Sequence, residues 1–164
     1  TLEFDIYPLP IINRAFGGSK TWEVLYYADK LVISDRPKII VYYCGSNDIN
    51  AGSNAQGIKE RFQMFVEYLR SHLPQTQIYF VSINRAPQKQ SKWHIVDAAN
   101  NAIEQYAQIT PNLEFVDVNP ALFDALDRPR LELFMGDRVH LKPSAYEAFT
   151  AIIKPKLQAT WNKL

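Results

Sequence analysis

Asp137 and His140 are the pair of side chains in this sequence best suited to acid–base chemistry. A carboxylate three residues before a histidine can turn back within one loop and accept a hydrogen bond from Nδ1. That bond would hold the imidazole with Nε2 facing a nucleophile, which is the orientation that a general base requires. His72 and His94 have no aspartate at this spacing, and His72 falls near the end of a predicted helix, where a surface or capping role is expected.

A glycine-containing segment, residues 13–19, can bind negative charge. Its sequence is Asn-Arg-Ala-Phe-Gly-Gly-Ser, and glycines let backbone N–H groups converge near a helix N-terminus. Either an oxyanion or a phosphate would fit there. A phosphate loop needs a glycine directly before its lysine, whereas Ser19 precedes Lys20, so the Walker pattern fails. Taken alone, Gly17-Gly18 favours a simple tight turn.

A second segment, Gly45-Ser46-Asn47-Asp48, directly follows an apolar run that ends at Cys44. Asn47 can present its side-chain NH₂ to a developing oxyanion. Asn and Asp after a strand are also ordinary turn formers, so this segment alone again favours a turn. The single cysteine, Cys44, is interpreted as a small buried hydrophobic residue.

The elements that must position these residues are those of an α/β protein. Short β-rich runs alternate with longer segments of helical period, which favours a parallel sheet with helices on its faces. The predicted strands are residues 11–12, 39–44, 78–83 and 113–118. Ligands of open α/β sheets bind beyond the carboxyl ends of the strands, where the three chemically suggestive segments fall.

Four helices are predicted. The first covers residues 22–31, and the last begins at Ser144, where Ser144-x-x-Glu147 forms a capping box and Pro155 should kink or interrupt the helix. The apolar faces of the two middle helices comprise Ile58, Phe62, Phe65, Val66, Leu69 and Leu73 in one, and Val96, Ala99, Ile103 and Tyr106 in the other. The stretch 119–143 exceeds a normal connection, and such loops are often functional.

Length and composition indicate one globular domain that spans residues 1–164. The chain has 47% hydrophobic residues and a net charge of +1, which suits a sizeable core. No run of like charges predicts a nucleic-acid partner, and no apolar stretch approaches the roughly 20 residues of a membrane span. The sequence opens on Thr1 without an initiator Met, so the compartment and any upstream targeting segment stay open.

Together, the order Asn-x-x-x-Gly-Gly-Ser, Gly-x-Asn-Asp and Asp-x-x-His-x-x-Pro resembles the SGNH hydrolases, also called GDSL esterases and lipases. The resemblance covers nearly the whole chain. It implies a flavodoxin-like three-layer α/β/α sandwich with a mainly parallel sheet, and hydrolysis of a small-molecule ester through an acyl-serine. Gly18 and Asn47 match the family's oxyanion donors, and Asp137 and His140 match its catalytic terminal motif. The resemblance implies no metal or organic cofactor.

The chain departs from the family's pattern most strongly before Asn13. The family's nucleophilic serine lies in a Gly-Asp-Ser-like block at the end of the first strand, and nothing before Asn13 resembles that block. We therefore expect the first strand and the serine to lie upstream of Thr1. Without that strand the sheet has an open edge, and the chain should fold poorly alone. Ser19 suits a helix N-cap and Ser46 a turn, so neither is the expected substitute.

Two other interpretations follow from the same residues. One is a binding module of this fold that has lost its nucleophile and retains a cleft for esters, sugars or a protein partner. The other is a phosphate or nucleotide binder that uses Gly17-Gly18-Ser19 and has no need of the Asp/His pair. Asn84, Arg85 and Trp93 follow a predicted strand and are candidates to border the cleft, although Trp93 equally suits packing at a helix start. The acyl group, the alcohol and the oligomeric state stay open.

Overall fold

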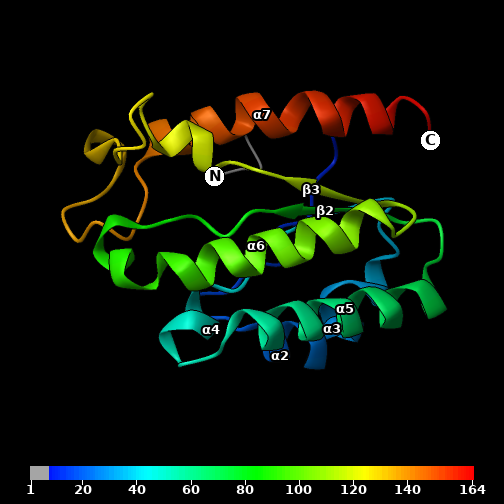
Figure 1. Cartoon of the computed structure of the whole chain (residues 1–164). Coiled ribbons are helices and arrows are strands. Elements are labelled where there is room, and N and C mark those ends of the chain that lie inside the picture. Colours follow the sequence, from blue (N-terminus) through cyan, green and yellow to red (C-terminus); the bar gives the residue numbers. More distant parts are fainter. Residues whose placement is uncertain (1–7) are drawn as a thin grey trace.

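The computed structural model describes residues 8–164, and a three-stranded parallel sheet of order β1-β2-β3 forms its centre (Figure 1). The strands are β1 (Ile39–Tyr42), β2 (Gln77–Val81) and β3 (Leu113–Val116). Three of the predicted strands are thus confirmed, each ending slightly earlier than expected. The expected α/β class with a parallel sheet is confirmed as well.

The strand predicted at residues 11–12 is wrong. This segment is irregular, because its backbone pairs with no strand in the described part of the chain. Its apolar side chains are nevertheless used. Leu9 and Ile11 are partly buried against the apolar cluster that also contacts Ile39 of β1. The apolar character of the run therefore reflects packing and not sheet pairing.

Helices cover both faces of the sheet. Helix α5 (Ala55–His72) connects β1 to β2, and α6 (Trp93–Gln108) connects β2 to β3. Right-handed crossovers between strands that follow one another in order place both helices on the same face. Helix α7 (Pro143–Trp161) lies on the opposite face, which gives the three layers seen in Figure 1. The shorter elements are α2 (Thr21–Tyr26), α3 (Ala28–Leu31), η1 (Ile33–Asp35), α4 (Ser46–Asn50), η2 (Pro87–Lys92), η3 (Asn119–Leu122) and η4 (Leu131–Leu133).

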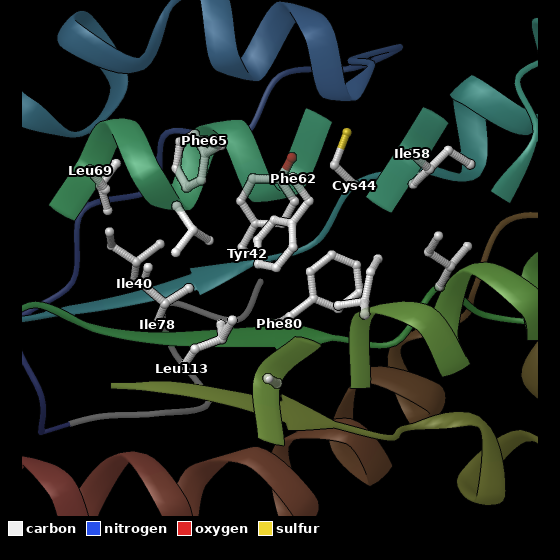
Figure 2. Close-up of a cluster of buried hydrophobic side chains, with 14 of the residues drawn as sticks. Ile40, Tyr42, Cys44, Ile58, Phe62, Phe65, Leu69, Ile78, Phe80 and Leu113 are labelled. Atoms are coloured by element: carbon white, nitrogen blue, oxygen red, sulfur yellow. The ribbon is translucent and has the colours of Figure 1, made fainter. Parts of the chain in front are cut away.

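Alternation along the strands builds two apolar layers. The register pairs Tyr42 with Phe80 and Phe80 with Phe115, so these side chains face α5 and α6. The predicted apolar face of α5 is buried throughout, and Figure 2 shows its rings packed on those of the strands. Phe62 is the centre of this layer, with its ring centroid 4.9 Å from that of Tyr42 and 4.7 Å from that of Phe80.

The other face of the sheet packs against α7. Tyr79 and Val81 of β2 and Val116 of β3 point to this side, as the period of two along a strand requires. Their helical partners are Ala145, Phe149, Ile153 and Leu157. The Asp137–His140 segment directly precedes α7, so this layer anchors one end of the candidate site.

Several helix boundaries differ from the predicted ones. The helix expected at residues 22–31 is broken at Tyr27 (φ −94°, ψ 13°) into α2 and α3. Helix α7 begins at Pro143, and its N-cap Lys142 makes no side-chain capping bond, so the predicted Ser144 capping box is wrong. Proline favours the first helical position, which moves the start one residue earlier. The helix also runs through Pro155 without interruption.

The described residues contain no helix that combines the length and the apolar character needed to cross a bilayer.

Replacing Phe62 by Ala should destabilise the fold. The side chain is completely buried among four other rings, and such a truncation costs about 3–5 kcal/mol of unfolding free energy. Urea denaturation measures the loss. Met64→Ala on the same helix is the matched control, because Met64 is 53% exposed and should lose well under about 1 kcal/mol. Equal losses in the two variants would contradict this account of the core.

Candidate active site

Asp137 and His140 lie in a tight turn between η4 and α7. The carboxylate turns back onto the ring, with Oδ2 2.5 Å from Nδ1. Its other oxygen accepts hydrogen bonds from the backbone N–H groups of Val139 and His140 at 2.9 and 3.0 Å. Arg138 adopts a left-handed conformation (φ 56°), which reverses the chain between the two side chains. Four consecutive residues therefore hold the carboxylate and the imidazole together.

The protonation of this pair follows from its hydrogen bonds. The bond from His140, followed by those from the two backbone N–H groups, lowers the pKa of Asp137 to about 2. Asp137 is therefore ionised at neutral pH and can only accept, so Nδ1 of a neutral imidazole carries the proton. The lone pair then lies on Nε2. The side chain of His140 is 79% exposed, which leaves this atom accessible.

Gly18 lies in the loop that precedes α2. Its φ of +75° is in the left-handed region, which explains a glycine at this position. The site of a Cβ atom at Gly18 has no neighbour within 4 Å, so the loop presents its backbone to open space. Ser19 was expected to cap the helix, but the N-cap residue is Lys20, and the Ser19 carbonyl serves a different contact.

Asn47 is the second residue of α4, where a turn was expected. Its side-chain Nδ2 donates to the Ser19 carbonyl at 3.1 Å, which joins it directly to the Gly18 loop. An amide NH₂ has two hydrogens, so one remains for a ligand. Gly45 precedes the helix with a φ of +133°, and a Cβ there would collide with Ile83. A glycine at 45 thus allows α4 to approach the end of β2 closely.

A buried carboxylate fixes the starts of α2 and α4 against each other. The side chain of Asp48 is 1% exposed and accepts from the Thr21 N–H at 3.0 Å and the Thr21 hydroxyl at 2.5 Å. Arg61 of α5 donates to Asp48 at 3.2 Å and to the Thr21 hydroxyl at 2.7 Å. Buried ions need such partners. The network ties α2, α4 and α5 together directly behind Gly18 and Asn47.

The two parts of the candidate site are joined only indirectly. The Gly18 loop and Asn47 are in direct contact, but no hydrogen bond within residues 8–164 links either of them to His140. The connection runs through η2, where the Gln88 N–H donates to the Arg138 carbonyl at 3.2 Å and Lys89 Nζ donates to the Ser46 hydroxyl at 2.8 Å. Neither this segment nor the Asp48 network is predictable from a sequence motif. A charged Arg61 beside the apolar face of α5 was the one available signal.

The other candidate nucleophiles of the described residues are not paired with His140. Neither Ser19 nor Ser46 contacts His140 in the described chain. The thiol of Cys44 is buried, and burial is the main cause that raises its pKa to about 12. It is therefore an inert side chain at neutral pH, as predicted. His72 lies at the end of α5 with Nδ1 3.0 Å from the Tyr68 carbonyl, which is a capping contact.

A shallow cavity of about 460 Å³ lies beyond the carboxyl ends of β2 and β3. Arg85 lines it, together with the acidic residues Asp117, Asp124 and Asp127. The guanidinium of Arg85 stacks 4.5 Å from the Phe123 ring centroid. Of the other predicted border residues, Asn84 is buried and Trp93 packs edge-on against Phe123 at 5.4 Å. Trp93 is thus mainly a packing residue.

Residues 8–164 hold no group of three or more side chains suited to binding a metal ion.

Comparisons with known proteins agree with this architecture. The family of GDSL-like lipases and acylhydrolases matches residues 4–148. A comparison with curated proteins gives no match. Among solved structures, a Streptococcus pneumonia protein named for platelet activating factor has 23% identity and a TM-score of 0.79, with 92% of this chain and 74% of that chain covered.

Two further solved structures share the fold. A variant of an acetyl-xylooligosaccharide esterase from Geobacillus Stearmophilus has 16% identity and a TM-score of 0.78, covering 94% of this chain and 76% of that one. A carbohydrate esterase family 3 protein from Talaromyces cellulolyticus has 21% identity and a TM-score of 0.75, covering 90% and 70%. The expected flavodoxin-like three-layer arrangement is thereby confirmed.

Removing the imidazole should raise the pKa of Asp137. In His140→Ala the largest stabiliser of the ionised carboxylate is lost, so its midpoint should move from about 2 towards the ordinary value near 4. The backbone N–H groups of Val139 and of residue 140 remain as donors and should keep the pKa of Asp137 below that value. The pKa of Asp137 in the parent protein and in the variant is measured from carboxyl ¹³C shifts followed against pH. Asp124, held low by Arg128, is the internal control and should not move; an unmoved Asp137 would refute the assigned cause.

Asp48→Ala should destabilise the protein strongly. It leaves Arg61 and the polar atoms of Thr21 without their buried acceptor, which costs about 3–5 kcal/mol of unfolding free energy. Chemical denaturation checks this. Asp97→Ala is the control, because Asp97 is 56% exposed in its pair with Arg85 and should cost less than about 1 kcal/mol. A loss at Asp48 no larger than that at Asp97 would be inconsistent with the network.

Proposed function

Because the chain belongs to the GDSL-like lipase/acylhydrolase family, we propose that it hydrolyses a small-molecule carboxylic ester through an acyl-serine. The observation that carries the proposal is the geometry of Asp137 and His140. The ionised Asp137 carboxylate fixes the ring through a bond of 2.5 Å between Oδ2 and Nδ1. This leaves Nε2 of His140 exposed as a base. This is the arrangement that nucleophilic catalysis by a serine requires.

His140 acts as a general base and then as a general acid. Its Nε2 takes the proton of the serine hydroxyl as the oxygen attacks the ester carbonyl, and the imidazolium returns that proton to the departing alcohol. Water then attacks the acyl-serine with the same assistance and releases the carboxylic acid. Asp137 stabilises the imidazolium in both steps and holds the ring in place.

The serine itself is proposed to lie upstream of residue 1. The first serine of the chain is Ser19, and the family pattern places the nucleophile ahead of the Asn13–Ser19 motif. Within residues 8–164 no serine hydroxyl is hydrogen-bonded to His140. A serine on a preceding strand would enter the carboxyl edge of the sheet beside β1, next to the Gly18 loop.

Gly18 and Asn47 are proposed to stabilise the tetrahedral oxyanion. The Gly18 N–H belongs to a loop with open space around it, and Asn47 retains one amide hydrogen after bonding Ser19. Each such donor contributes about 3–4 kcal/mol to the transition state. No metal or organic cofactor has a part in this scheme.

The cavity beside Arg85 is proposed to receive the alcohol part of the ester. Its lining of one guanidinium and several carboxylates suits a polar alcohol that offers hydroxyl groups. Two of the structural neighbours are named as esterases of carbohydrates, which agrees with an alcohol of this kind. The alternative is a catalytically inactive binding module that uses the same cleft.

Hydrolysis of p-nitrophenyl acetate by the full-length protein tests the proposal. We expect turnover that His140→Ala abolishes, while Asn47→Ala lowers kcat by about 100-fold to 1000-fold with little change in KM, because an oxyanion donor acts in the transition state. His94→Ala is the matched control and should keep full activity, since that exposed residue lies at the start of α6. Turnover that survives in His140→Ala would refute the mechanism, and a full-length protein without turnover would favour the binding module.

A further inference from the structure

The short helix η2 (Pro87–Lys92) bridges the two parts of the candidate site through polar contacts on both of its sides. On one side the Gln88 N–H donates to the Arg138 carbonyl at 3.2 Å, inside the Asp137–His140 turn. On the other side Lys89 Nζ donates to the Ser46 hydroxyl at 2.8 Å, and Lys92 Nζ donates to the Ile49 carbonyl at 3.1 Å. Both lysines therefore contact α4, which carries Asn47.

Lys89 is unusual among the lysines in its burial. Only 8% of the residue is exposed, although lysine normally keeps its ammonium group in water. A buried ammonium is costly unless hydrogen-bond acceptors replace its water. Here the acceptors are the hydroxyl and, at 3.5 Å, the carbonyl of Ser46. Burial and the nearby Lys92 also lower the pKa of Lys89, which reflects the cost of keeping the charge there.

We propose that Lys89 is a positioning residue that sets the Asn47 amide at its distance from the Asp137–His140 turn. The role rests on the proposed function, because it acts through a proposed oxyanion donor. Lys89 and Gln88 are neighbours on one short element, so the contact to Ser46 and the contact to Arg138 move together.

The geometry of α4 explains why such a contact is needed. The helix has five residues, which is too short to be stable by itself. Within its first turn, Asp48 accepts from Thr21 and Asn47 donates to the Ser19 carbonyl, and both contacts lie on the side of α2. Lys89 holds Ser46, the first residue of the helix, from the side of η2. Asn47 directly follows Ser46, so a shift of the first turn moves the amide. Misplacing a group in a reacting site by about 1 Å can reduce the rate by about 100-fold.

Lys89→Met in the full-length protein tests the role. The substitution keeps the aliphatic stem and removes the ammonium group. We expect kcat for p-nitrophenyl acetate to fall by at least about 10-fold with KM nearly unchanged. In an Asn47→Ala background the same substitution should change kcat by less than about 2-fold, because its effect passes through Asn47. A loss of similar size in both backgrounds would overturn the proposal.

Hydrogen exchange gives a measurement that does not depend on catalysis. In Lys89→Met the backbone amides of residues 46–50 and 138–140 should exchange faster than in the parent protein. Lys59→Met is the matched control, because Lys59 bonds Gln63 on the outer part of α5, away from both segments. Unchanged exchange in both segments would overturn the proposal, even if the protein proves to be no esterase.

Ser46→Ala covers the case in which Lys89→Met fails to fold. It removes the hydroxyl acceptor, leaves the carbonyl of Ser46 for Lys89 and creates no cavity larger than one oxygen atom. The same two segments should exchange faster, and kcat should fall in the same direction by a smaller factor. Exchange and kcat equal to those of the parent protein would count against Lys89 as a positioning residue.

Discussion

A carboxylate that is excluded from water can persist in a fold only where donors replace its hydration shell, and Asp48 meets this requirement with Thr21 and Arg61. Thr21, Asp48 and Arg61 come from α2, α4 and α5, so satisfying one charge fixes three elements at once. Gly18 lies in the loop before α2, and Asn47 lies in α4 beside Asp48. Their mutual position is thus a consequence of burying a charge, and the apolar layer between α5 and the sheet supplies the dry surroundings.

The pair proposed for acid–base chemistry is built from local contacts and not around a buried charge. Asp137 and His140 owe their geometry to four consecutive residues and to one left-handed residue, Arg138, with little help from the core. One part of the site is therefore local and exposed, and the other is assembled from distant segments around a buried ion. The helix η2 connects the two parts, and its buried Lys89 bonds the Ser46 hydroxyl at the start of α4.

The sequence predicts best what depends on short-range pattern. The short β-rich runs of β1, β2 and β3 and the apolar face of α5 predicted the sheet and the layer that packs on it, and the spacing of Asp137 and His140 predicted their bond. Boundaries were less predictable, because Pro143 competes with Ser144 for the start of α7. Contacts between distant segments were not predictable. Thr21 lies 27 positions from Asp48, and Lys89 stands in a polar run typical of solvent-exposed chain.

The exposure of the imidazole has a consequence for selectivity. With 79% of the His140 side chain and 47% of the Asp137 side chain open to water, a high dielectric constant weakens the attraction between carboxylate and imidazolium. In the proposed mechanism, an ester that covers the pair would displace that water and strengthen the attraction during the reaction. Discrimination between substrates would then depend on how completely each ester excludes water from His140, in addition to how well it fits beside Arg85.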